Sequence, residues 1–150
     1  MAMIEERDAA YLREQFQQRL ADDVTIDYFT QHQSVLTVPG QECAYCAETG
    51  QILEELAALT PKLHVVTHDF VAERELAERL GVDKIPALIF RGKNKGAMRY
   101  FGIPSGYEFA TLVEDVIDAS TGEHGLSRET AAWLSDLDRD LHIQVFVTPT

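Results

Sequence analysis

Cys43-Ala44-Tyr45-Cys46 holds the two cysteines of this 150-residue chain three positions apart, and residues 44–59 carry apolar side chains at helical spacing. The first turn of a helix leaves backbone N–H groups without partners, and these groups and the helix dipole stabilise a thiolate. Two cysteines at this spacing can also close a disulfide with each other. The spacing therefore predicts a redox pair in which Cys43 is the attacking thiol and Cys46 resolves the mixed disulfide.

The segments on both sides of this motif predict an alternation of strands and helices. β-Branched, aromatic and apolar residues predict strands over 24–29, 63–70, 87–90 and 97–101, and helical spacing is found over 4–20, 44–59, 73–80 and 106–119. The polar turn before residue 97 predicts that the last two strands form a hairpin. This order predicts an α/β fold, in which helices flank a central mixed sheet and one additional helix precedes it.

The last part of the chain has a different character. Ser127 can cap a helix that runs to about Asp138, and residues 142–147 alternate in the manner of a strand. We therefore expect one complete unit over residues 1–119. We expect a linker, a helix and a strand over 120–150, and we interpret this extension as the start of something longer.

The composition limits the partners and the location that we expect. The chain carries 13 lysines and arginines against 25 aspartates and glutamates, a net charge of −12, and we find no basic cluster of the kind that binds nucleic acid. It has no apolar run of the roughly 18 residues that a membrane span needs, and its N-terminus shows no signal-peptide core. We therefore expect a cytoplasmic protein that binds neither nucleic acid nor membrane.

Half of a zinc site is an alternative interpretation of the two cysteines. Tetrahedral zinc takes four ligands, and the missing ligands would have to come from the five histidines. His64 and His68 fall in an expected strand, where they form no familiar ligand pair. We expect no metal, but from the residues alone a zinc site and an incidental cysteine pair both remain open.

Three further stretches point to a known family. Ile85-Pro86 stands where thioredoxin-fold proteins carry a cis-proline that faces the active-site disulfide, and residues 99–109 read RYFGIPSGYEF. Residues 143–150 read IQVFVTPT. With the cysteine motif, these stretches closely resemble the protein disulfide oxidoreductases, glutaredoxin-like proteins that are built from two tandem thioredoxin-fold units. The resemblance covers nearly the whole chain.

The resemblance implies a thioredoxin-like fold and a role for each residue of the motif. It implies that residues 1–119 are the N-terminal unit and that 120–150 are the opening helix and strand of the second unit. It makes Cys43 the attacking thiol and Cys46 the resolving one, and the residues between them tune the redox potential. The substrate-binding residues implied in this way are Ile85, Pro86, Ala44 and Tyr45.

Two carboxylates are candidates for proton transfer to the cysteines. In thioredoxins a buried acid near the resolving cysteine accepts a proton, and Asp27 lies in the first expected strand. We interpret Asp27 as a partly exposed residue at the end of that strand, and proton transfer is the alternative. Glu48 lies within two turns of Cys43 on the expected helix, and its alternatives are proton transfer and a solvated side chain.

These residues together predict a thiol–disulfide oxidoreductase that acts on protein or small disulfide substrates. No glycine-rich dinucleotide fingerprint is present, so we expect no bound cofactor. Electrons would come from a thioredoxin-reductase-like flavoenzyme or a small thiol. The alternative is a partner-docking domain with little turnover, because residues 31–42 predict a long loop and Glu42 stands where thioredoxin has a tryptophan.

Overall fold

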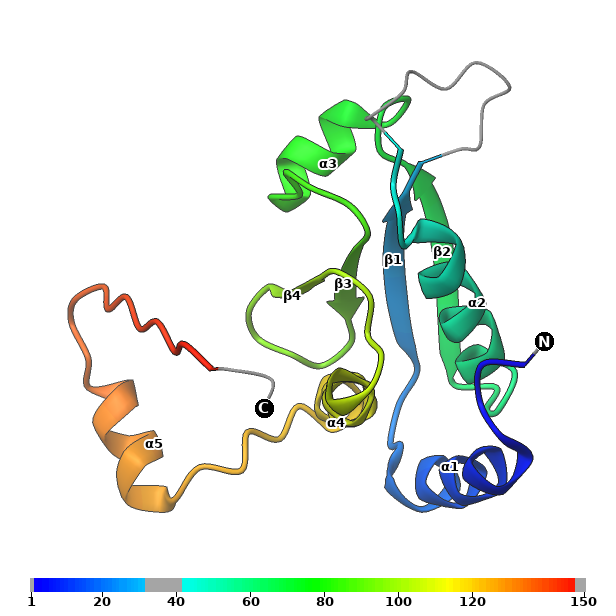
Figure 1. Ribbon diagram of the computed structural model, residues 1–150. Helices are drawn as coiled ribbons and strands as arrows, with labels where there is room; N and C mark the ends of the chain where they lie inside the picture. The colour runs from blue at the N-terminus through cyan, green and yellow to red at the C-terminus, as the bar shows by residue number, and fades with distance from the viewer. Residues whose placement is uncertain (1, 32–41, 148–150) are drawn as a thin grey trace.

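The computed structural model describes residues 2–31 and 42–147, which form an α/β fold around a four-stranded sheet (Figure 1). The strands are β1 (Val24–Thr30), β2 (Leu63–Asp69), β3 (Ala87–Arg91) and β4 (Met98–Phe101), and the helices are α1 (Glu6–Arg19), α2 (Cys46–Ala57), α3 (Arg74–Leu80), α4 (Tyr107–Thr121) and α5 (Arg128–Ser135). Each of these elements coincides with a predicted one to within a few residues. None of the helices in the described ranges is long and apolar enough to cross a membrane.

The sheet is mixed, as the sequence predicts, and its strand order is β2-β1-β3-β4. Strand β1 pairs in parallel with β2 and antiparallel with β3, and β3 pairs antiparallel with β4 in the predicted hairpin. Helix α2 is the crossover between the two parallel strands. Cys43 N–H donates to the side chain of Gln31, the residue after β1, so the cysteine motif lies near the carboxyl end of a central strand.

Helices cover both faces of the sheet, and the alternation of β1 decides which residues meet them. Ile26 and Tyr28 belong to the larger core, which the sheet shares with α1, α2 and α4. Phe29 points to the other face and packs with Ala77 of α3 and the neighbouring Val82. The cysteine helix therefore lies on the face of the sheet that carries the larger core.

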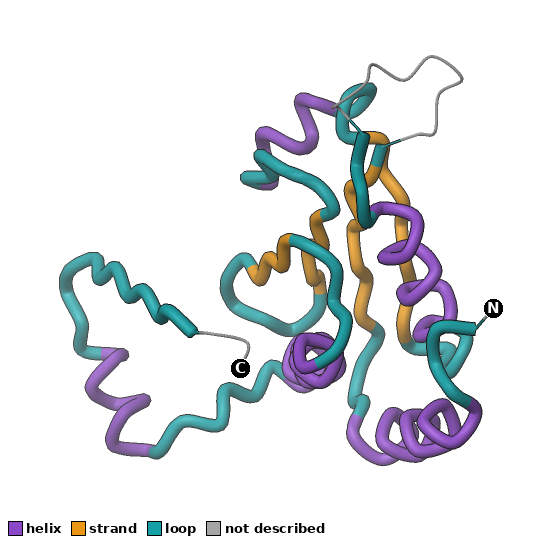
Figure 2. The backbone as a smooth tube through the Cα atoms, in the orientation of Figure 1, coloured by secondary structure: helices purple, strands orange, loops and turns teal. Residues whose placement is uncertain are grey.

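The C-terminal extension is the part of the fold that differs from the prediction. Helix α5 forms, with the Ser127 hydroxyl accepting the Thr130 N–H as a cap, but none of its residues is buried. The predicted strand over 142–147 is wrong, because these residues belong to no strand and run apart from the sheet (Figures 1 and 2). A strand needs a neighbour for its N–H and C=O groups, and the described residues supply none here. The division at residue 119 stays a prediction.

Asp115 on α4 makes the stability of the fold depend on pH. Burial, together with the negative charge of Asp118, raises its pKa from 3.8 to about 6. The folded state therefore binds more protons than the unfolded state between these two values, so the free energy of unfolding falls as the pH rises through this window.

We expect Asp115→Asn to increase the free energy of unfolding by about 1 kcal/mol at pH 7.5, after allowance for the half-exposed side chain, and to have little effect near pH 4. Urea unfolding at both pH values measures the difference. Glu54→Gln is the matched control, because Glu54 is exposed on α2 and the variant makes the same change in charge. An equal gain for Asp115→Asn at both pH values would contradict the interpretation.

Candidate functional site

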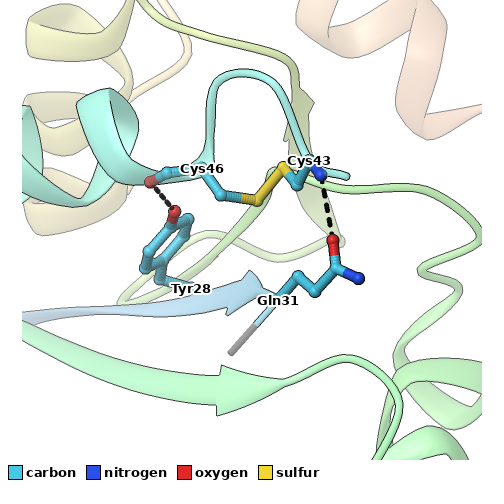
Figure 3. Close-up of a disulfide and its surroundings, with 4 residues drawn as sticks. All are labelled: Tyr28, Gln31, Cys43 and Cys46. Carbon is cyan, nitrogen blue, oxygen red and sulfur yellow. Dashed lines mark hydrogen bonds between the residues drawn. A yellow bond between two sulfur atoms is a disulfide. The ribbon is translucent and has the colours of Figure 1, made fainter. Parts of the chain in front are cut away.

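Cys43 and Cys46 form a disulfide at the N-terminus of α2, with their Cα atoms 5.5 Å apart (Figure 3). Cys46 is buried and is the first residue of the helix, whereas Cys43 is half-buried and lies in the loop before it. The predicted start of the helix at residue 44 is wrong by two residues, because the backbone of Tyr45 is not helical and caps the helix instead. The disulfide nevertheless brings the Cys43 sulfur to the first turn of α2.

The first turn of α2 gives this sulfur a setting that favours an anion. Thr49 N–H, which donates to Tyr45 C=O, is the first N–H of α2 that takes part in the hydrogen-bond pattern of the helix. The preceding N–H groups of the helix and the positive end of its dipole point toward the N-terminal end of α2, where the disulfide lies. Glu48 adds a negative charge in the same turn, but its side chain is exposed to solvent. Its predicted part in proton transfer stays a prediction.

Two side chains hold the cysteines, Tyr28 near the end of β1 and Gln31 just after it, and neither is among the predicted site residues. The Tyr28 hydroxyl donates a hydrogen bond to Cys46 C=O, and Gln31 Oε1 accepts one from Cys43 N–H at 2.9 Å (Figure 3). Burial raises the pKa of the Tyr28 hydroxyl, so the phenol remains a donor at neutral pH. The available signal was the alternation of β1, which places Tyr28 on the same face as α2.

Ile85 and Pro86 lie at the same end of the sheet as the disulfide. The peptide bond between them is cis. Pro86 is buried and immediately precedes Ala87, which pairs with Phe29 near the carboxyl end of β1. Gly102 N–H donates to Pro86 C=O, whereas Ile85 takes part in no backbone hydrogen bond outside helices and strands within the described ranges. Ile85 can therefore offer its N–H and C=O to an extended peptide; this role stays a prediction.

The structure places Asp27 differently from the prediction of a partly exposed residue at the strand end. Asp27 is 4 % exposed in the middle of β1. Its carboxylate accepts hydrogen bonds from the Arg91 guanidinium and lies 3.0 Å from His68 Nε2. Burial alone would raise the pKa of Asp27, but the bonds from Arg91 and His68 outweigh it, so the pKa lies below its ordinary value. Strand alternation puts Asp27 on the face away from α2, so the structure does not bring it to the cysteines.

The zinc alternative has no support in the part of the chain that the structure describes. Residues 2–31 and 42–147 contain no group of three or more histidine, cysteine, aspartate or glutamate side chains placed to hold a metal ion. The two cysteines are bonded to each other, which leaves no thiolate for a metal. His64 pairs instead with Asp23. The long loop predicted over residues 31–42 lies almost wholly outside the residues that the structure describes.

No protein-family model and no curated protein matches this sequence. Among solved structures, the chain is similar to a protein disulfide oxidoreductase from Aeropyrum pernix, at 23% identity and a TM-score of 0.73 over 91% of this chain and 56% of that one. It is also similar to the alkylhydroperoxide reductase AhpF from Enterococcus faecalis, at 22% identity and a TM-score of 0.69 over 84% of this chain and 57% of that one. The chain thus spans a little over half the length of both. With the mixed sheet, its flanking helices and the disulfide at the start of α2, this likeness shows that the chain has a thioredoxin-like fold.

Proposed function

We propose that this chain is a thiol–disulfide oxidoreductase that works through Cys43 and Cys46. The observation that carries the proposal is the disulfide itself, which joins a half-buried cysteine to the first residue of a helix. A helix N-terminus lowers a thiol pKa, and a low pKa supplies the thiolate that attacks a disulfide. The similar structure from Aeropyrum pernix is described as a protein disulfide oxidoreductase, which supports the same chemistry here.

The reaction starts from the reduced pair. The Cys43 thiolate attacks one sulfur of a substrate disulfide, so that a mixed disulfide forms and one substrate thiolate leaves. Cys46 then gives up its proton and attacks the Cys43 sulfur, which expels the second substrate thiolate. Two electrons pass to the substrate, which takes up protons from solvent, and the chain returns to the disulfide seen in the structure.

Disulfide-containing proteins are the substrates that we propose. Tyr45, which stands between the cysteines, is 55 % exposed and offers an aromatic surface beside the reacting sulfurs. Ile85 supplies backbone groups that can pair with an extended peptide, as an edge of a sheet does. A substrate chain laid along Ile85 would bring its disulfide to the end of β1, where Cys43 is located.

A separate donor must restore the dithiol after each turnover. We propose a thioredoxin-reductase-like flavoenzyme or a small thiol, with the cytoplasm as the setting. The likeness to a structure described as an alkylhydroperoxide reductase supports a redox role that needs an electron donor. Cys43 and Cys46 supply the sulfurs of this chain. Thiol–disulfide exchange with the donor needs only a second thiol or disulfide as reactant.

Reduction of insulin with dithiothreitol as electron source tests the proposal. We expect the wild-type chain to accelerate the precipitation of reduced insulin, and Cys43→Ser to leave only the uncatalysed rate, because the attacking thiolate is lost. Wild-type protein with both thiols alkylated serves as the control for the background reaction. Circular dichroism establishes that the variant is folded. Equal rates for wild type and Cys43→Ser would refute the catalytic role.

A further inference from the structure

Two residues at the carboxyl end of β1, Tyr28 within the strand and Gln31 just after it, hold both halves of the disulfide. Figure 3 shows them side by side next to the two cysteines, Tyr28 by Cys46 and Gln31 by Cys43. Each bond is made to a backbone atom of the cysteine and not to its sulfur. Backbone atoms do not change when the disulfide opens, so both bonds can persist in the reduced state.

The Tyr28 contact is built into the core. The residue is 3 % exposed and belongs, with Ile52 and Leu53 of α2, to the larger core. A Cβ atom added to Gly50 would lie only 3.5 Å from Tyr28 Cε1, so the second turn of the helix runs close over the ring. The hydroxyl therefore has a fixed position below the start of α2, from which it holds the carbonyl of Cys46.

The Gln31 contact holds Cys43, the other half of the disulfide. Cys43 precedes the helix, so no helical hydrogen bond fixes its backbone. Its N–H donates to the Gln31 side chain in a half-buried position at the end of β1. The two anchors are only three positions apart, Tyr28 in β1 and Gln31 just after it, and they hold cysteines that are also three positions apart.

We propose that Tyr28 and Gln31 are positioning residues that keep the two thiols within bonding reach after reduction. This inference rests on the proposed function. The equilibrium between dithiol and disulfide depends on the effective concentration of one thiol at the other, and fixed geometry raises that concentration. The two anchors therefore favour the disulfide, and losing either makes the pair easier to reduce.

Tyr28→Phe tests this inference, because the variant removes the hydroxyl and keeps the ring in the core. We expect its equilibrium constant for oxidation by glutathione to fall about tenfold, which corresponds to a reduction potential about 30 mV less negative. Gln31→Leu is expected to shift the constant in the same direction. The potential is measured by equilibrating the chain in glutathione buffers, alkylating free thiols and quantifying the two forms by mass spectrometry.

Tyr100→Phe is the matched control. Tyr100 is a half-buried tyrosine whose hydroxyl also donates to a backbone carbonyl, that of Ile103. Both residues are far from the cysteines in the sequence. Removing that hydroxyl affects stability in the same general way but should leave the potential at the wild-type value. A change in potential specific to Tyr28→Phe and Gln31→Leu therefore reports on the anchors and not on a loosened fold.

The inference is overturned if folded Tyr28→Phe keeps the wild-type potential, or if Tyr100→Phe shifts it equally. The glutathione measurement needs no protein substrate, so it is independent of the insulin assay. Shifted potentials without insulin reduction would support the anchors and count against the proposed function. Insulin reduction with unshifted potentials would support the function and reject the anchors.

Discussion

Asp27→Asn is expected to lower the free energy of unfolding by about 2 kcal/mol at neutral pH. The Asp27 carboxylate is buried in β1 and binds the guanidinium of Arg91 from β3, and it also meets His68 from β2. Asparagine keeps the shape of the side chain but removes the charge. The Arg91 side chain, which is 57 % exposed, then loses its charge-assisted hydrogen bonds, and the buried asparagine amide offers one acceptor oxygen where the carboxylate offered two.

The same variant has a predictable dependence on pH. The pKa of Asp27 lies below its ordinary value of 3.8 in the folded chain, because the hydrogen bonds from Arg91 and His68 outweigh the effect of burial. A lowered pKa contributes stability that is present above the unfolded value and is lost as the pH falls through the folded value. We therefore expect the difference between wild type and Asp27→Asn to shrink below about pH 4.

Asp23→Asn provides the matched comparison for this prediction. Asp23 also pairs with a histidine of β2, His64, at 3.1 Å, but both side chains are at least half exposed. Exposed pairs contribute about 0–1 kcal/mol, so this variant should barely change urea unfolding. If both variants lost the same free energy of unfolding, burial of Asp27 would not strengthen its interactions, and the prediction would be wrong.

Cys46→Ser is expected to stop turnover while leaving the first exchange intact. Cys43 keeps its position at the start of α2 and can still attack a substrate disulfide, but no neighbouring thiol remains to release the product. We expect the rate of insulin reduction to fall by about two orders of magnitude or more. A stable mixed disulfide between Cys43 and the substrate should accumulate instead.

A cyclic peptide with one internal disulfide is a suitable probe for this prediction. After reaction with reduced Cys46→Ser, mass spectrometry should detect an adduct that contains one whole peptide and that dithiothreitol removes. Cys43→Ser is the control, because its remaining thiol on Cys46 is 6 % exposed and should form little adduct. Adducts of equal yield on both variants would contradict the assignment of attacking and resolving thiols, and none on either would favour a docking domain.

Strand alternation and helical spacing predicted most of the fold, because both patterns depend on which side chains face the core. The alternation in β1 and the helical spacing after Cys46 both come from side chains that meet a core. The predicted C-terminal strand failed for the opposite reason. Ile143 and Phe146 are 79 % and 87 % exposed, so a correct local pattern did not produce a strand where no neighbouring strand was present.

The contacts that complete the site could not be predicted from local patterns. Arg91 is 64 positions from Asp27 in the chain, and the two meet only because the antiparallel register sets β3 beside β1. Tyr28 and Gln31 likewise act on cysteines more than ten positions ahead. A single sequence shows the residue types at these positions, but the register and the path of the chain decide which of them touch.

Adjacent positions of β1 face different parts of this protein. Tyr28 points to the disulfide side of the sheet, and Asp27 points to the opposite side, toward Arg91 and His68. A substitution at position 27 therefore alters the charged cluster without touching the cysteines, whereas one at position 28 acts on the core and on the redox pair that we propose.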